Sequence, residues 1–371
     1  MIAGLRRSAK AQARPRGVGL RYTASRVWRW FRRKAARLPL RLAGLSPLAS
    51  SLYFCLFSAA FRREHHAVVQ GLLKYGEQQD WPGGSSAVLR RSIHRLEKGL
   101  LMRHRRPAFA VGYIHETVAC YARAVASVCE AQAAASPELR WAHDVLKAYF
   151  HQAGDHPAIR SAHLLFHSTP WPEPADGHQR VPYRRDLSQP PPVRYEDLLA
   201  LARRRRSVRW FLRRPVPREV IDRAILVAAQ SPSACNRQPF VLRVIDDPGL
   251  LARVAQVPMG AAGFWENIPV LVLVVGQQRH FFSPRDRHLI YVDGALAAMG
   301  FLYAAEAQGL STCCINWPDI RKKEALMARL LGLEPDERII MCIAVGYPDP
   351  DGLVACSEKK PLEQLRRYNF E

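Results

Sequence analysis

The first 63 residues contain no aspartate and no glutamate, although they contain fifteen lysines and arginines. This leaves 40 of the 55 basic residues and all 32 acidic residues for the rest of the chain, so most of the net charge of +23 lies at the N-terminus. Basic segments with a few aromatic residues are typical of solvated tails, of elements on anionic membranes and of arms that bind nucleic acid. The apolar sequence at 51–61 (SLYFCLFSAAF) makes nucleic acid the weaker alternative. A solvated tail and a peripheral membrane contact both remain open for residues 1–61.

No two cysteines have the C-x-x-C spacing of a zinc or redox site, and they form no paired framework. The eight cysteines are Cys55, Cys120, Cys129, Cys235, Cys313, Cys314, Cys342 and Cys356. In a chain of 371 residues this pattern predicts reduced thiols in the core and a cytoplasmic location.

The apolar run 47–61 is too short for a membrane-spanning helix, which needs about 20 residues. It follows a long basic lead and no small-residue cleavage site is visible, so we do not expect a secretory signal. The sequence also lacks a P-loop, a Rossmann glycine fingerprint and any Ser-His-Asp or Cys-His arrangement. It therefore predicts no catalytic side chain and no metal ligand.

The composition, with 48% hydrophobic and 23% charged residues, is typical of a folded protein. Residues 62–167 have apolar residues at helical spacing, most clearly at 109–135 and 141–150, and we expect a helical domain there. Seven prolines follow between 168 and 192, so a linker is predicted at 168–194. The remainder, 195–371, alternates between helical and strand-like patterns.

Within the helical domain, the sequence HRLEKGL places His94 one helical turn from Glu97 and Lys98. We expect pairing on a helix surface, because a metal site would need a second pair of ligands. Gly99 is a candidate for the end of this helix.

The C-terminal part predicts four strands and four helices. The predicted strands are 240–245, 269–276, 312–316 and 339–345, and the predicted helices are 196–206, 218–230, 289–308 and 320–331. This arrangement indicates an α+β domain with one sheet enclosed by helices.

Two short stretches in this part carry candidate binding residues. Three arginines gather around a serine, at Arg205, Arg206, Ser207 and Arg209, and could bind a phosphate through charge-assisted hydrogen bonds. Asn236 and Gln238, in a loop bracketed by prolines, could pair with the edge of a heterocycle. From the residues alone, a solvated helix end followed by an ordinary turn remains the favoured alternative.

These stretches resemble the FMN-dependent nitroreductase family. The sequences RRRSVRWF at 204–211 and SPSACNRQPF at 231–240 are similar to its two opening motifs. Three later segments resemble its C-terminal elements: AEAQGLST at 305–312, IIMCIAVGYP at 339–348 and KKPLE at 359–363. The resemblance covers 195–371 and implies a nitroreductase-like fold with a central, mostly antiparallel sheet. The HRLEKGL string resembles longer members with a helical N-terminal extension.

The resemblance also implies a set of FMN-binding residues. Those for the phosphate and ribityl chain are Arg205, Arg206, Ser207, Arg209, Lys359 and Lys360. Those around the ring and ribityl chain are Pro232, Ser233, Asn236, Gln238, Ile315 and Asn316. Cys235 is expected to be a tolerated small residue, whereas Trp317, where many members have glycine, could stack on the ring or narrow the substrate pocket.

The implied activity is that of an NAD(P)H oxidoreductase that reduces a nitroaromatic, a quinone or a similar acceptor with ping-pong kinetics. Family members form homodimers with the flavin between two chains, so a homodimer is expected. Two alternatives stay open: a flavin oxidase or dehydrogenase on the same scaffold, and a non-enzymatic interaction protein anchored to a membrane or a polysaccharide-assembly complex.

Overall fold

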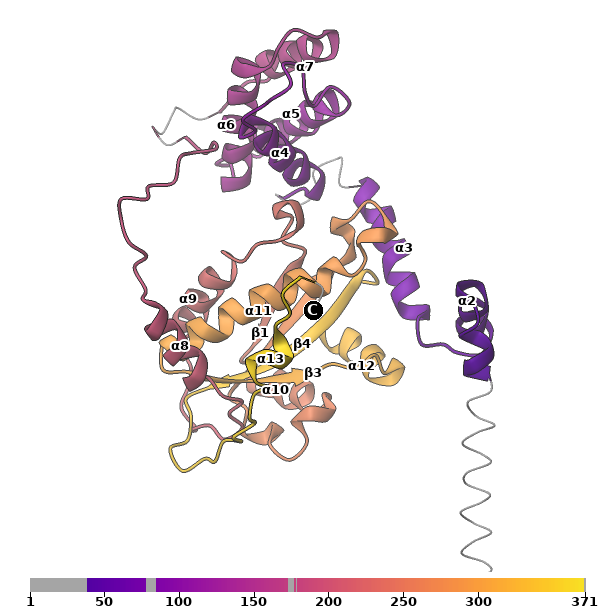
Figure 1. Cartoon of the computed structure of the whole chain (residues 1–371), viewed down its shortest axis with the longest axis vertical. Coiled ribbons are helices and arrows are strands. Elements are labelled where there is room, and N and C mark those ends of the chain that lie inside the picture. The colour runs from indigo at the N-terminus through magenta and orange to yellow at the C-terminus, as the bar shows by residue number, and fades with distance from the viewer. Residues whose placement is uncertain (1–38, 78–84, 173–176, 178, 370–371) are drawn as a thin grey trace, which may run out of the picture. The chain divides into compact units, whose positions relative to one another are not determined.

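The computed structural model describes residues 39–77, 85–172, 177 and 179–369 (Figure 1). Most of the basic segment, with Trp28, Trp30 and Phe31, lies outside the described residues. The chain divides into two compact units, Met1–Arg63 and Glu64–Glu371.

The described part of the first unit is built around helix α2 (Pro47–Leu56). Ser46 caps this helix, since its hydroxyl accepts a hydrogen bond from the amide of Ala49 at 3.1 Å. None of its residues is buried, although the helix is apolar. The surrounding leucines and phenylalanines are exposed as well, so this segment presents an apolar surface to solvent.

The second unit begins with helices that confirm the predicted all-α region. They are α3 (Arg62–Glu77), α4 (Ala87–Leu100), α5 (Ile114–Glu130), α6 (Pro137–Gln152) and α7 (Pro157–Ser168). Helices α4 to α7 enclose a core of their own that includes Leu89, Tyr121 and Tyr149. The described residues between α7 and residue 195 form no helix or strand, although Trp171 stacks on His143 of α6 with ring centroids 4.2 Å apart.

Gly99 does not end its helix, because α4 continues to Leu100. A Cβ atom at Gly99 would lie 2.2 Å from the ring of Phe109. The glycine is therefore required by the close packing of this ring and not by a helix cap. His94 does lie beside Glu97, with Nδ1 3.6 Å from the carboxylate, as expected for helix-surface pairing.

The C-terminal part contains one four-stranded antiparallel sheet, which confirms the predicted α+β fold. Its strands are β1 (Phe240–Ile245), β2 (Val270–Gln277), β3 (Ser311–Asn316) and β4 (Glu337–Gly346). Their order is β1-β2-β4-β3, so β3 lies at an edge. A parallel bridge between Ser207 and Thr312 extends this edge by one contact.

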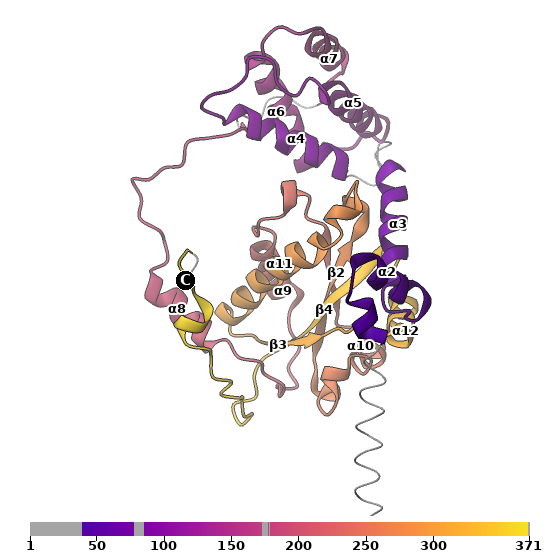
Figure 2. The ribbon, with the colours of Figure 1, turned by 45° about the vertical axis from the view of Figure 1, so that its right-hand side comes forward.

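Helices cover both faces of the sheet (Figure 2). On one face, α9 (Arg218–Ala228) and α11 (Leu289–Ala307) pack side by side on β2 and β4. On the other face lie α10 (Pro248–Ala255), which the sequence did not predict, and α12 (Arg321–Leu331). Helix α8 (Tyr195–Arg204) precedes the arginine cluster, and α13 (Leu362–Leu365) lies near the C-terminus.

Helix α11 belongs to the segment Pro284–Ala307, which is long and apolar enough to cross a membrane by length and composition. Half of its most apolar window is buried inside the protein, and Phe301 and Ala305 are fully buried. Its apolar character is therefore that of a core helix.

Candidate functional site

The arginine cluster follows the end of α8 and runs along the outer edge of β3. The amide of Val208 donates a hydrogen bond to the carbonyl of Thr312 at 3.0 Å, which fixes the segment against the strand. Farther on, Asn267 clamps the chain through both backbone groups of Phe211, at 2.6 and 3.1 Å. These contacts hold Ser207 and its neighbouring arginines in place at the sheet.

Among the described residues, Arg205, Arg206 and Arg209 form no ion pair with a carboxylate, whereas the preceding Arg204 pairs with Glu306 at 3.0 Å. Burial raises the pKa of the Cys313 thiol, and the positive charges of Arg209 and Arg205 and a hydrogen bond from Ser207 partly offset this effect. Two of the arginines therefore act on the start of β3. Unpaired cations in a fixed cluster suit a bound anion.

Strand β3 offers backbone groups at its outer edge. The N–H and C=O groups of one strand residue point to the same side of the strand, and those of the next residue point to the other side. The carbonyl of Thr312 points away from β4, towards the amide of Val208. Cys314 and Asn316 share this outward orientation and are exposed, whereas Ile315 faces β4 and its side chain is buried. Of the two predicted ring contacts, Asn316 is thus the one that is accessible at this edge.

The Pro232–Gln238 segment forms a tight loop between α9 and β1. Cys235, Asn236 and Gln238 all have φ values near +50°, in the left-handed region that residues other than glycine seldom adopt. The Ser233 hydroxyl accepts a hydrogen bond from the Gln238 amide at 3.0 Å. The Gln238 side chain donates to Asn236 Oδ1, also at 3.0 Å. The two predicted amide side chains therefore lie together.

Four charged residues that the sequence analysis missed hold this loop, three of them directly and Glu138 through Arg90. They are Arg90, Glu138, Arg237 and Asp293. Asp293 of α11 accepts the Ala234 amide at 3.0 Å, and burial raises the pKa of its carboxyl group. Arg237 is buried and donates to the carbonyls of Ala234 and His280 at 2.9 and 3.2 Å. The sequence could have indicated Arg237 as a loop anchor, because it is a charged residue inside the loop motif. The sequence around the other three residues contains no feature that indicates this role.

Within one chain the two halves of the predicted site lie at opposite ends of the sheet. The loop leads into Phe240, which pairs through Gly276 with Arg338 at the start of β4. The arginine cluster bridges to Thr312, which pairs with Val345 near the end of β4. Seven residue steps along β4, from Arg338 to Val345, separate these two points, or roughly 20 Å. A single chain therefore does not join the loop to the cluster.

The remaining predicted residues are placed as follows. Lys359 and Lys360 lie in an exposed stretch, 353–369, in which every described residue is exposed. Trp317, for which a ring contact or a narrowed pocket was considered, has its side chain buried in the core and its indole N–H donates to Glu324. All eight cysteines are free, but only Cys120, Cys313 and Cys342 are buried, so the expectation of core thiols holds for these three alone.

A hollow of about 520 Å³ lies beyond the arginine cluster, next to Arg213 and Arg214. Trp265 and Asn267 also line it. It includes none of the predicted cofactor residues, so it is distinct from the candidate site.

The family model "Nitroreductase family" matches residues 202–262 and 251–347 of this chain. The C-terminal half contains a nitroreductase domain. The domain includes the arginine cluster, the loop and all four strands.

Curated relatives of the nitroreductase domain include iodotyrosine deiodinases. The chain is 26% identical over 204 residues to iodotyrosine deiodinase 1 of Sus scrofa, covering 46% of this chain and 68% of the relative. It is 26% identical over 183 residues to an iodotyrosine deiodinase of Haliscomenobacter hydrossis, covering 42% of this chain and 81% of the relative. Among solved structures, an FMN-dependent nitroreductase from Clostridium difficile matches with 19% identity and a TM-score of 0.41, covering 46% of this chain and 99% of that chain.

Proposed function

We propose that the nitroreductase domain binds FMN and uses NAD(P)H to reduce a nitroaromatic, a quinone or a similar oxidised acceptor. The observation that supports this most directly is a set of three arginines, Arg205, Arg206 and Arg209, whose backbone is held beside Ser207 at the edge of β3 and which pair with no carboxylate among the described residues. A doubly charged phosphate needs several donors, and a cluster of arginines on a fixed stretch of backbone supplies them. Bound FMN would supply the redox chemistry, by accepting a hydride from the nicotinamide and giving electrons to the acceptor.

The residues of this chain would position the cofactor and exclude water. The arginines and Ser207 would bind the phosphate, and the exposed edge of β3 at Asn316 would place a backbone donor against the ring. The amide side chains of Asn236 and Gln238 would recognise the pyrimidine edge. No side chain is required as a general acid or base.

We propose a homodimer in which the loop of one chain meets the arginine cluster of the other. The separation of roughly 20 Å along β4 supports this arrangement, because one chain alone leaves each half of the site without the other. Exposed apolar side chains on α9 and α11 supply a candidate interface; they are Leu226, Val227, Val292 and Leu296. A symmetric pair buries the same patch on both chains.

The binding test uses the double variant Arg205→Ala/Arg209→Ala in the full chain. Loss of two charge-assisted contacts, each worth roughly 1.5–3 kcal/mol, should raise the FMN Kd at least about 100-fold. The matched control is Arg253→Ala, an exposed arginine on α10. An unchanged Kd in the double variant, measured by quenching of flavin fluorescence, would overturn the assignment.

The acceptor is identified by a panel assayed with NADH and with NADPH. Nitroaromatics and quinones test the main proposal. Iodotyrosine belongs in the panel because the curated relatives are named for its deiodination. If iodotyrosine is the single substrate of the panel that is turned over, the proposed nitroaromatic or quinone acceptor is wrong. The proposal that the domain binds FMN would still stand.

We also propose that residues 1–61 contact an anionic membrane surface. Leu48, Leu52 and Leu56 of α2 are 51–71% exposed, and every charge in the first 63 residues is positive. Each basic residue near anionic lipid contributes about 1 kcal/mol, and the apolar helix adds contact area. The full chain should pellet with anionic vesicles, partly even at high salt, whereas a chain that begins at Glu64 should not. Equal pelleting of both proteins would refute the proposal.

A further inference from the structure

Arg90 links the helical domain directly to the loop of the candidate site. Its Nε donates to the carbonyl of Asn236 at 2.9 Å, although Arg90 belongs to α4 and is 146 residues away in sequence. Helix α4 carries no residue that the proposed chemistry requires. The contact therefore needs an explanation of its own.

The guanidinium of Arg90 is held from the side of the helical domain. Its Nη1 donates to Glu138 Oε2 of α6 at 2.8 Å, and both side chains are largely buried. Glu138 is itself fixed by the Ser86 amide at 3.0 Å and the Ser85 hydroxyl at 2.6 Å. A buried ion pair with satisfied hydrogen bonds is rigid, so Arg90 presents its Nε to the loop in one orientation.

The loop needs such an anchor because of its backbone conformation. Cys235, Asn236 and Gln238 lie in the left-handed region, where each residue other than glycine costs about 1 kcal/mol or more. Contacts within the nitroreductase domain fix the amide of Ala234 and the amide of Gln238. The carbonyl of Asn236 is fixed by Arg90, in the middle of the strained stretch.

We propose that Arg90 is a positioning residue through which the helical domain sets the conformation of the Cys235–Gln238 loop and hence the affinity for FMN. This inference rests on the proposed function in one respect only, the identity of the ligand. The coupling between α4 and the loop can be measured without it.

The test uses Arg90→Met in the full chain, with Arg95→Met as the matched control. Arg95 lies on the same helix, but its guanidinium stacks on Tyr113 of the helical domain at 3.6 Å. Two readouts are taken: hydrogen–deuterium exchange of residues 231–240 in protein free of FMN, and the FMN Kd. Arg90→Met should speed exchange in the loop at least about tenfold, leave β2 and β4 unchanged, and raise the Kd about tenfold.

Arg90→Lys provides a second variant that keeps the charge. A single ammonium group cannot reproduce the fork that joins Asn236 and Glu138, so we expect partial recovery of both readouts. If loop exchange in Arg90→Met equals that of the control, the inference is overturned. If loop exchange rises while neither the variant nor the unchanged protein binds FMN, the positioning role stands and the proposed cofactor is wrong.

Discussion

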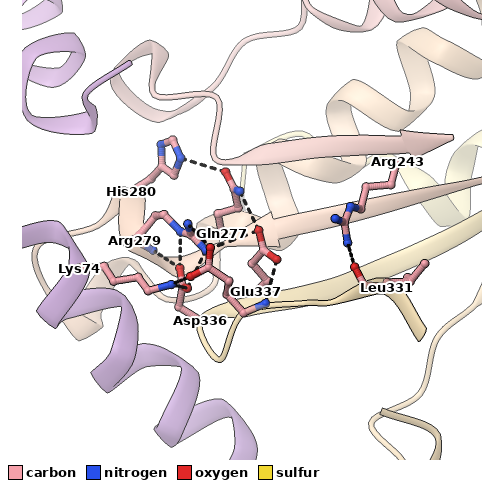
Figure 3. A network of polar contacts seen from close by, with 9 residues as sticks. Lys74, Arg243, Gln277, Arg279, His280, Leu331, Asp336 and Glu337 are labelled. Atoms are coloured by element: carbon pink, nitrogen blue, oxygen red, sulfur yellow. Dashed lines mark hydrogen bonds and ion pairs between the residues drawn. The ribbon is translucent and has the colours of Figure 1, made fainter. Parts of the chain in front are cut away.

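The replacement Asp336→Asn tests how α3 is attached to the nitroreductase domain. Asp336 is fully buried immediately before β4, where it faces Arg279 and Lys74 (Figure 3). Arg279 binds its carboxylate through Nε and Nη2, both at 2.7 Å, and Lys74 of α3 contacts it at 2.9 Å. The variant removes the negative charge and retains the shape of the side chain.

The magnitude follows from the partners that remain. Removing one member of a buried ion pair typically costs roughly 3–5 kcal/mol, because the other charge stays buried without compensation. Here Arg279 keeps Glu334 at 3.3 Å and Glu337 at 3.5 Å, and Lys74 keeps its contact with Glu334. We therefore expect the lower end, a loss of about 3 kcal/mol in the free energy of unfolding at pH 7.

The same residue predicts a pH dependence. Burial alone would raise the pKa of Asp336, but the hydrogen bonds and charges of Arg279 and Lys74 outweigh it and lower the pKa below its ordinary value. A carboxyl group with a lowered pKa stabilises the folded state fully above about pH 3.9 and loses this effect as the pH falls towards its folded pKa. The difference between the unchanged protein and Asp336→Asn should therefore shrink below about pH 4.

The assay is urea denaturation of the full chain, followed by tryptophan fluorescence at pH 7 and pH 3. Asp351→Asn, an exposed aspartate, is the control and should change stability by less than about 0.5 kcal/mol. A loss below about 1 kcal/mol for Asp336→Asn at pH 7 would refute the reasoning. So would a difference that grows as the pH falls.

Two further predictions concern His280 and the dimer. Burial, followed by the charges of Arg279 and Arg90, lowers the pKa of His280 to about 4. Between about pH 6.5 and pH 4 the unfolded chain therefore binds a proton at His280 that the folded protein does not, so the free energy of unfolding falls by up to roughly 3 kcal/mol as the pH decreases. His280→Gln should abolish this decrease, whereas His115→Gln, which changes an exposed side chain, should not. Leu226→Glu places a charge on the exposed apolar face of α9. The mass measured by light scattering should fall from twice 42.0 kDa to the 42.0 kDa of a single chain, and FMN binding should be lost. A monomer that keeps full FMN affinity would contradict the shared site.

The sequence predicted the sheet well because its strands depend on local pattern. Residues 270–277 are apolar at almost every position, which is typical of a strand buried on both faces, and β2 is buried along nearly its whole length. Helix α10 was missed because its first residues, Pro248 and Gly249, are typical of a turn. Here Asp247 caps the helix and Pro248 occupies its first turn, where a missing N–H is tolerated.

The candidate site was only partly predictable, for a physical reason. The arginine cluster is contiguous in sequence, so its spacing alone brings the charges together. The anchors of the loop come from distant segments, and nothing in the sequence near Arg90 or Glu138 indicates that Arg90 meets Asn236 or that Glu138 holds Arg90. The position of Trp317 in the sequence did not indicate its surroundings, because the fold turns its indole into the core beside Glu324.

The placement of the anchors has a consequence for the role of the helical domain. Three left-handed residues in one loop raise its free energy by about 3 kcal/mol in total, and such a conformation persists only where the surroundings fix it. The sheet needs no contribution from α4, since both of its faces are covered by helices of the nitroreductase domain. The contact of α4 with the domain therefore affects the loop more than it affects the fold. A change in the packing of the helical domain would alter the affinity of the site while the sheet stays intact.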